Sequence, residues 1–198
     1  PAGRWDWTAG WVYLSLWLTG VAAATIVMMR VHPDLAAERG RGLKGARSWD
    51  KVLAMVAAVY GPQATWIVSG LDERYGWTTD MAFSVRAAAL TIALGGYVLT
   101  VWAIVANRFF AAIVRIQDDR GHSGPYGVIR HPGYAGMIGV FGATPLILGS
   151  WWGLIPAAVT VAATVTRTAL EDRMLQKELD GYAAYAGRVR YRLVPGLW

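Results

Sequence analysis

Two polar segments of this chain hold the side chains that could do chemistry. The first runs from Gly124 to Gly136, GPYGVIRHPGYAG, and sets an arginine, a histidine and two tyrosines among four glycines and two prolines. Pro132 suits the first turn of a helix, whose free N–H groups attract a carboxylate or another anion. Proline also disfavours a helical conformation in the preceding residue. We therefore expect His131 at the entrance of a helix, with its side chain fixed there.

The second segment runs from Thr166 to Tyr185, TRTALEDRMLQKELDGYAAY, and is predicted to be a helix. Its polar positions recur at spacings of three or four, which puts them on one face. These positions are Arg167, Glu171, Glu178, Tyr182 and Tyr185, with the apolar Met174 and Leu175 filling the step between the two glutamates. A charge at the membrane edge is costly unless it is paired or functional. A plain surface ion pair between Arg167 and Glu171 is the alternative, and it would contribute only about 0.3–0.5 kcal/mol.

The composition indicates a membrane protein of one domain. Of the 198 residues, 55% are hydrophobic and 16% are charged, whereas soluble domains carry roughly a quarter charged residues. The absence of cysteine excludes disulfides, thiolate metal sites and a cysteine nucleophile. The net charge of +6 comes without a basic stripe interleaved with aromatic residues, so nucleic acid is not an expected partner.

Hydropathy predicts five membrane spans, at about residues 7–29, 52–71, 87–106, 134–149 and 151–168. A spanning helix needs about 20 mostly apolar residues. The uncharged run 133–166 is too long for one span and contains the turn-forming sequence GSWWG at 149–153, so it predicts a tight helical hairpin. We interpret the first span as a membrane helix rather than a secretory signal, because no small-residue cleavage site stands out.

The positive charges predict the orientation. Sixteen of the 19 Lys and Arg residues lie on one side, which the positive-inside rule makes cytoplasmic. This side holds the segments 30–51, 107–133 and 169–198, and the N-terminus lies outside. Because a tight hairpin brings its two ends together, His131 and Tyr134 should lie near Arg167 and Glu171. We therefore expect an all-α integral membrane protein with a cytoplasmic cofactor pocket between the two polar segments.

In their order, these motifs resemble the isoprenylcysteine carboxyl methyltransferase family and its wider phospholipid-methyltransferase relatives. The resemblance rests on GPYGVIRHPGYAG, on the pair Glu171-Asp172 after Arg167, on Tyr182 and Tyr185, and on the tail RVRYRLVPGLW. The upstream sequences HPDLAAERGR and NRFFAAIVRIQ also look like bacterial members, which suggests a bacterial inner membrane. Two features depart from the family pattern: Asp172 stands where Glu is common, and the loop RGHSGPY is short.

The resemblance implies S-adenosylmethionine as the cofactor and no metal. Glu171 would accept hydrogen bonds from the cofactor's ammonium group, and the N–H groups near Pro132 or the Arg130 side chain would hold its carboxylate. A tyrosine would face the sulfonium or stack on the adenine. The implied cofactor-binding residues are Gln117, His122, Tyr126, Arg130, His131, Pro132, Tyr134, Gly136, Glu171, Asp172, Tyr182 and Tyr185.

The implied reaction is direct displacement of the methyl group by a lipophilic or prenylated acceptor, which needs alignment more than acid–base help. A carboxylate acceptor needs no base and could be oriented by an arginine, with Arg167 as the first candidate and Arg130 as the second. Glu171 completes the catalytic set. An amine or thiol acceptor would need a base, for which His131 or Glu178 could serve. The acceptor would enter sideways from the membrane lipids.

Two other functions are compatible with the sequence. Sterol reductases have a similar C-terminal core and use NADPH, although Glu171 and Glu178 suit the 2′-phosphate of that cofactor poorly. A lipid-binding membrane protein without catalysis is the other alternative.

Overall fold

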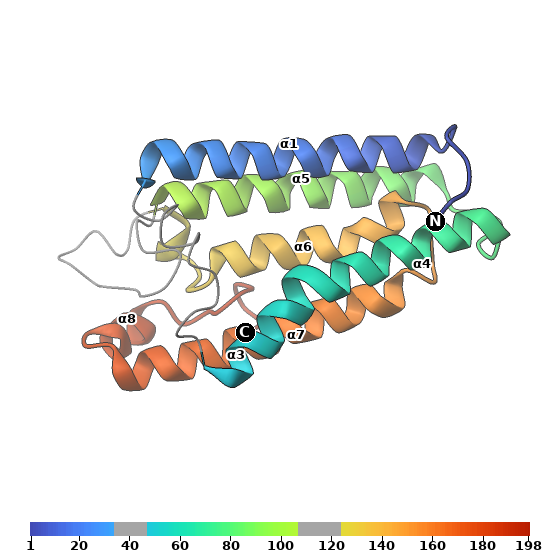
Figure 1. Cartoon of the computed structure of the whole chain (residues 1–198). Helices are drawn as coiled ribbons and strands as arrows, with labels where there is room; N and C mark the ends of the chain where they lie inside the picture. The colour runs from blue at the N-terminus through green and yellow to red at the C-terminus, as the bar shows by residue number, and fades with distance from the viewer. Residues whose placement is uncertain (34–46, 107–123) are drawn as a thin grey trace.

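The computed structural model describes residues 1–33, 47–106 and 124–198, and the long elements in these ranges are helices (Figure 1). The first two long helices are α1, Thr8–Val31, and a composite helix in which α3, Ser48–Met55, continues through a π-helical turn, Val56–Tyr60, into α4, Gly61–Tyr75. Helix α5 is Phe83–Ala106, α6 is Pro132–Ile147, α7 is Leu154–Glu178 and α8 is Tyr182–Arg188. A short 3-10 helix, Gly124–Gly127, precedes α6.

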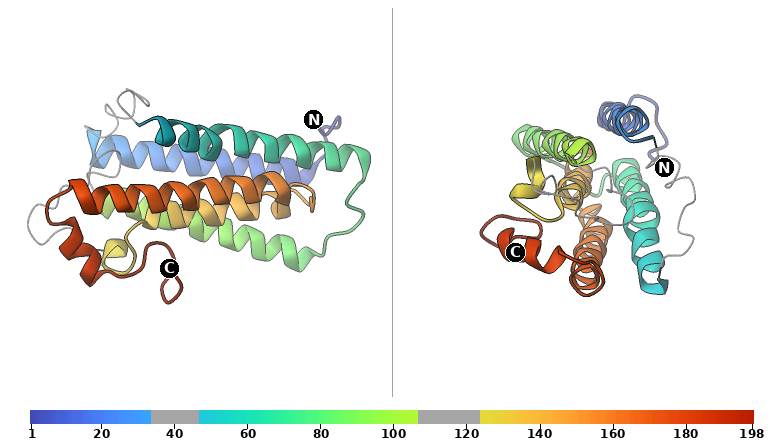
Figure 2. Two further views of the ribbon diagram at one scale, coloured as in Figure 1. Left: turned by 90° about the horizontal axis from the view of Figure 1, so that it is seen from below. Right: turned by 90° about the vertical axis from the view of Figure 1, so that its left-hand side faces the viewer.

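The helices form a bundle around α6, which packs against α1, α4, α5 and α7 (Figure 2). The chain reverses between α6 and α7 at residues 148–153, so these two helices form the predicted hairpin. We call this end of the bundle the hairpin-turn end. We call the opposite end, where α7 meets α8, the Asp172 end.

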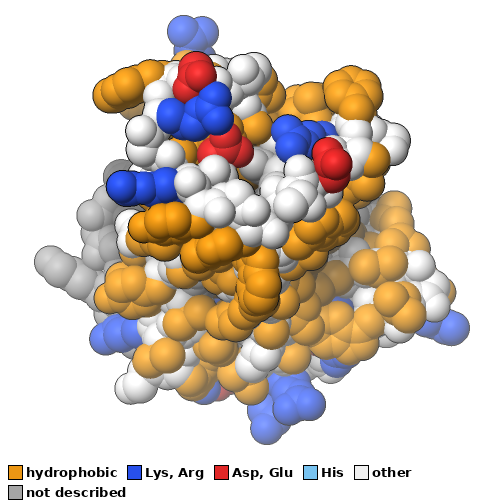
Figure 3. Space-filling view, turned by 90° about the vertical axis from the view of Figure 1, so that its right-hand side faces the viewer, with side chains coloured by type: hydrophobic (Ala, Val, Ile, Leu, Met, Phe, Trp, Pro, Cys, Tyr) orange, Lys and Arg blue, Asp and Glu red, His pale blue; other side chains and the backbone are white. Residues whose placement is uncertain are grey.

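For the described part of the chain, the prediction of an all-α membrane fold is confirmed. Three helices there are long and apolar enough to cross a membrane: Thr8–Val31, Ser48–Tyr75 and Phe83–Ala106. They coincide with the first three predicted spans. Many large apolar side chains on them are exposed, including Val98 at 67% and Val52 at 62%. Figure 3, which looks onto the hairpin-turn end, shows a largely hydrophobic surface with a few charged side chains.

A buried carboxylate fixes the hairpin turn. Asp72, at the end of α4, is 2% exposed and accepts a hydrogen bond from the Ser150 hydroxyl in the turn. It also accepts from the backbone N–H of Thr78 at 2.6 Å and from the Thr78 hydroxyl at 2.8 Å. Gly149 has a φ of 80°, which suits glycine. The turn and the loop between α4 and α5 are therefore held together.

Helices α5 and α6 touch through their backbones. A Cβ atom on Gly136 would collide with the carbonyl oxygen of Gly96 and with the Thr100 hydroxyl. A Cβ atom on Gly96 would in turn collide with the carbonyl oxygen of Gly136. Small residues at such a crossing allow the close approach that membrane helices use for packing. This contact sets the position of α6, and with it the side chains at the α6 N-terminus.

We expect Gly136→Ala to lower the free energy of unfolding by about 1–3 kcal/mol, because the added methyl group meets backbone atoms that cannot rotate away. The control is Gly142→Ala on the same helix, where an added Cβ meets nothing within 4 Å. Thermal unfolding followed by tryptophan fluorescence in detergent compares the two. Equal midpoints for both variants would show that the α5–α6 crossing can relax.

Candidate functional site

The centre of the Asp172 end is the fully buried carboxylate of Asp172 on α7, with a side-chain exposure of 0%. It accepts six hydrogen bonds from five side chains. The donors are Arg130 Nε at 2.7 Å and Nη2 at 2.9 Å, Gln176 Nε2 at 2.8 Å, Arg192 Nε at 2.9 Å, Tyr182 Oη at 3.0 Å and His131 Nε2 at 3.2 Å. We call these six residues the Asp172 hub.

The hub holds Asp172 as a carboxylate. Burial by itself would raise the pKa of Asp172, but the hydrogen bonds from His131, Arg130 and Arg192 outweigh it and hold that pKa well below its ordinary value. Burial raises the pKa of Tyr182, and the nearby charge of Asp172 raises it further. Tyr182 therefore stays a hydrogen-bond donor to the carboxylate at neutral pH.

Arg130 is fully engaged inside the protein. Two of its nitrogens bind Asp172 in the bidentate geometry that suits a guanidinium. Its third nitrogen, Nη1, donates to the carbonyl oxygens of Val189 at 2.7 Å and Arg190 at 2.9 Å. Each of its three nitrogens is hydrogen-bonded inside the protein and the side chain is only 5% exposed, so Arg130 organises the site and is poorly placed to bind an acceptor molecule.

The last residues of the chain close the hub. We call residues 189–198 the C-terminal strap. The backbone N–H groups of Arg130 and His131 donate to the carbonyl oxygens of Tyr191 and Arg192, both at 2.9 Å. Arg192 reaches Asp172 from this strap, and its guanidinium carbon lies 4.9 Å from the centre of the Trp198 ring. The strap thus fixes the backbone at the entrance of α6.

A second polar cluster lies beside the hub and joins three helices. The Tyr134 hydroxyl on α6 donates to Glu171 Oε2 on α7 at 2.7 Å. Arg167, one turn earlier on α7, donates from Nε to Asp50 Oδ1 on α3 at 2.6 Å. The Arg167 guanidinium carbon lies 5.3 Å from the centre of the Tyr134 ring, a cation–π contact. We call these four residues the Arg167 cluster.

Arg167 differs from Arg130 in what its guanidinium can still bind. Its side chain is 23% exposed, and Asp50 beside it is 21% exposed. Within the described residues its hydrogen bonding uses Nε alone, and neither terminal nitrogen has a partner among these residues. Two N–H groups side by side suit a carboxylate or phosphate.

The hub and the cluster meet at the start of α6. The rings of His131 and Tyr134 stack with centres 5.9 Å apart and planes at 18°. His131 is the residue before the helix, with φ −126° and ψ 61°, and Pro132 opens the first turn. The sequence predicted a non-helical His131 before a helix that starts at Pro132, and it predicted Tyr134 near Arg167 and Glu171; the structure shows both. His131 itself contacts Asp172 and Tyr182 and adjoins the Arg167 cluster through the Tyr134 ring.

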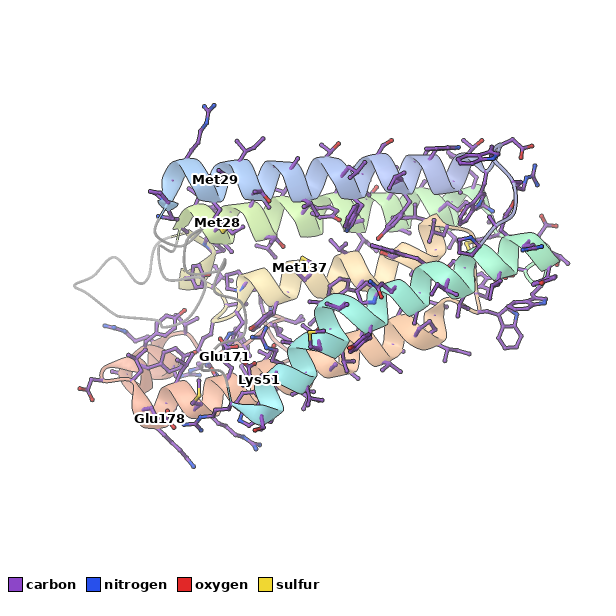
Figure 4. All side chains as sticks on the ribbon, in the orientation of Figure 1. Met28, Met29, Lys51, Met137, Glu171 and Glu178 are labelled. Atoms are coloured by element: carbon purple, nitrogen blue, oxygen red, sulfur yellow. The ribbon has the colours of Figure 1, made fainter. Side chains whose placement is uncertain are left out.

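The expected continuous helical face from Arg167 to Tyr185 is wrong. Helix α7 ends at Glu178, and Gly181 with φ 80° turns the chain into α8. Glu178 is half exposed and pairs with Arg47 on the surface, away from Glu171 (Figure 4). Tyr182 reaches Asp172 only because the chain reverses.

The other predicted site residues are placed as follows. Pro132 is buried at the start of α6, and Gly136 is buried against α5. The Tyr185 hydroxyl donates to the backbone carbonyl of Tyr126 at 2.8 Å, so these two pack together beneath the strap. Gln117 and His122 lie outside the described residues.

Three residues of the site were not singled out from the sequence. Gln176 follows Asp172 by four positions, a spacing that predicts contact on a helix. Asp50 and Arg192 carry no such signal, because Asp50 lies 117 positions from its partner Arg167, and Arg192 reaches Asp172 only through the fold of the strap.

Residues 84–180 match the model of the phospholipid methyltransferase family. This match over about half of the chain confirms the resemblance drawn from the motifs. Neither the comparison with curated proteins nor that with solved structures gave a match. The family and the apolar helices together indicate a methyltransferase of the membrane type.

Proposed function

We propose that the protein transfers a methyl group from S-adenosylmethionine to a lipophilic acceptor at the cytoplasmic surface of the membrane. The observation that carries this proposal is the Arg167 cluster. It sets an open guanidinium beside a carboxylate and a phenol at the mouth of the helical hairpin. We further propose that α6 and α7 complete five spans, with the Asp172 end in the cytoplasm, as the positive charges indicate.

The side chains of the cluster fit the charged groups of the cofactor. Glu171 can accept hydrogen bonds from an ammonium group in addition to the one from Tyr134. The N–H groups of Gly133 and Tyr134 in the first turn of α6 lack partners within the helix and suit a carboxylate. The Tyr134 ring offers a face to a sulfonium. When bound, S-adenosylmethionine supplies an electrophilic methyl group on sulfur.

In this proposal the residues of the site have two different roles, positioning the site and orienting the acceptor. The Asp172 hub holds His131 and the α6 N-terminus in place, with Arg130 as a positioning residue. Arg167 orients the acceptor through its two terminal nitrogens, while Asp50 fixes its direction through Nε. Alignment of the two reactants is the main requirement of a displacement reaction. A carboxylate acceptor fits this arrangement best, because it binds a guanidinium and needs no base.

We expect Glu171→Gln to weaken S-adenosylmethionine binding by about tenfold or more, because a charge-assisted hydrogen bond to the ammonium group is lost. Calorimetry on the detergent-purified protein measures the dissociation constant. The matched control is Glu178→Gln, which changes an exposed carboxylate on the same helix and should leave the constant within twofold.

The same titrations test the proposed function itself. S-adenosylmethionine and S-adenosylhomocysteine should both bind, and NADPH should not. Binding of NADPH alone would make the site that of a reductase. Binding of none of the three would favour a lipid-binding protein without catalysis.

A further inference from the structure

A cavity of about 600 Å³ lies at the hairpin-turn end, far along the bundle from the Asp172 hub. Residues 1–5 cross over the start of α1 and form one wall. The other walls come from α1, α4 and the end of α6, mainly through Trp7, Trp11, Tyr13, Trp17, Trp66 and Leu148. This volume is that of a ligand pocket, and it exceeds any ordinary packing defect.

Hydrogen bonds within the wall already use several of its polar groups. Trp66 Nε1 donates to the Tyr13 hydroxyl at 2.9 Å, and Trp11 Nε1 donates to the Trp5 carbonyl at 2.7 Å. The rings of Trp17 and Trp66 pack edge to face with centres 5.3 Å apart. The interior is thus an aromatic surface that suits an apolar occupant.

The rim of the cavity holds one guanidinium between two carboxylates. The Arg4 guanidinium donates to both oxygens of Asp6 at 2.7 Å and to Glu73 at 3.4 Å. The hydrogen bond from the Arg4 guanidinium lowers the pKa of Asp6 to about 2. An anionic ligand would have to compete with these two carboxylates for Arg4, so the rim gives an anionic headgroup no advantage.

The cavity wall is continuous with the surface that faces the membrane lipids. Leu14 and Trp11 line the cavity and are also 39% and 49% exposed on α1. The neighbouring Val12 and Leu18 are exposed as well, at 44% and 52%, on a helix apolar enough to span. Tryptophans are typical of the membrane–water interface, where a lipid chain meets its headgroup. The occupant therefore enters from the bilayer.

We propose that this cavity binds one hydrocarbon chain of a membrane lipid whose headgroup is uncharged or zwitterionic. The chain lies against Trp17 and Trp66, and the headgroup lies beside the paired Arg4. This site is separate from the Arg167 cluster at the other end of the bundle. Lipid binding here does not depend on methyl transfer.

The test uses the delipidated 198-residue chain in detergent micelles and a phosphatidylcholine with a photoactivatable diazirine in one acyl chain. Cross-linked peptides are quantified by mass spectrometry as the lipid fraction rises. Labelling of peptides with Trp17 or Trp66 should saturate at one lipid per chain, and unlabelled phosphatidylcholine should compete better than phosphatidylglycerol. Labelling at the exposed Val98 and Ile155 should rise without saturation. A parallel, unsaturated rise at all four positions would overturn the proposal.

The second test is a substitution that fills the cavity. Leu14→Trp places bulk in the wall and should reduce the saturable labelling of the Trp66 peptide at least fivefold. The matched control is Leu18→Trp, one turn further along α1 and outside the cavity, which should leave it unchanged. Undiminished labelling in Leu14→Trp would contradict the proposal. If this variant fails to fold, the saturation curve of the unmodified chain still decides.

Discussion

Asp172→Asn should lower the free energy of unfolding by about 3–5 kcal/mol, the largest effect on stability that we expect. The substitution keeps the size of the side chain but removes the charge that Arg130 needs, and Arg130 is itself 5% exposed. The new amide group also turns a donor toward five side chains that are donors already. The uncompensated buried guanidinium dominates the loss.

Thermal unfolding followed by tryptophan fluorescence measures this effect, and the 11 tryptophans give a strong signal. Asp180→Asn is the matched control, because Asp180 is exposed in the turn after α7. The two midpoints should differ by many degrees. Similar midpoints would mean that water or another group replaces the lost charge.

The stability of the unmodified chain should also depend on pH in a defined direction. The pKa of Asp172 is lower in the folded chain than the ordinary value of about 3.9. Its contribution to stability is therefore complete above that value and is lost progressively as the pH falls below it. Unfolding midpoints between pH 7 and pH 3 should fall more steeply for the unmodified chain than for Asp172→Asn.

Arg167→Lys should reduce kcat/KM for a carboxylate acceptor by about 10²–10³-fold, on the scale seen when one oriented donor is removed from a catalytic site. Lysine keeps the charge, but a single ammonium group cannot hold Asp50 and also present two parallel N–H groups. The dissociation constant of S-adenosylmethionine should stay within threefold. Transfer of a labelled methyl group to a prenylated cysteine acid, together with calorimetry, gives both values.

Arg173→Lys serves as the control, because Arg173 is exposed on the same helix. Equal losses of turnover and cofactor affinity in Arg167→Lys would move Arg167 to the cofactor site. A small loss of turnover with an amine acceptor, next to a large loss with a carboxylate, would identify the acceptor group that the guanidinium recognises.

The local parts of this fold could be predicted from the sequence. The three long spans and the hairpin follow from apolar length and from the turn residues at 149–153. The helix start at Pro132 follows from the chemistry of proline, and the proximity of Tyr134 to Glu171 follows from the hairpin. Each of these depends on residues that are close in sequence or joined by one short turn.

The division of labour between Glu171 and Asp172 could not be predicted, because neighbouring acids in a sequence look alike. On a helix, successive side chains point about 100° apart. Glu171 therefore faces Tyr134, whereas Asp172 faces the hub and is fully buried. Which face is buried depends on where the C-terminal strap and α8 pack. Tertiary packing determines this, and the local sequence does not. The same holds for Arg130, whose partners lie 42 and about 60 positions away.

The backbone contact between α5 and α6 also limits how this sequence can change during evolution. Gly10 and Gly20 are crowded by the side chains of Trp7 and Tyr97, so a second substitution that shortens the ring could make room for a larger residue. Gly96 and Gly136 are crowded by each other's carbonyl oxygens, which no substitution can shorten. Gly10 and Gly20 can therefore be replaced if the neighbouring aromatic residue is replaced as well. The other two have no compensating mutation, and glycine should persist at both for as long as the two helices cross there.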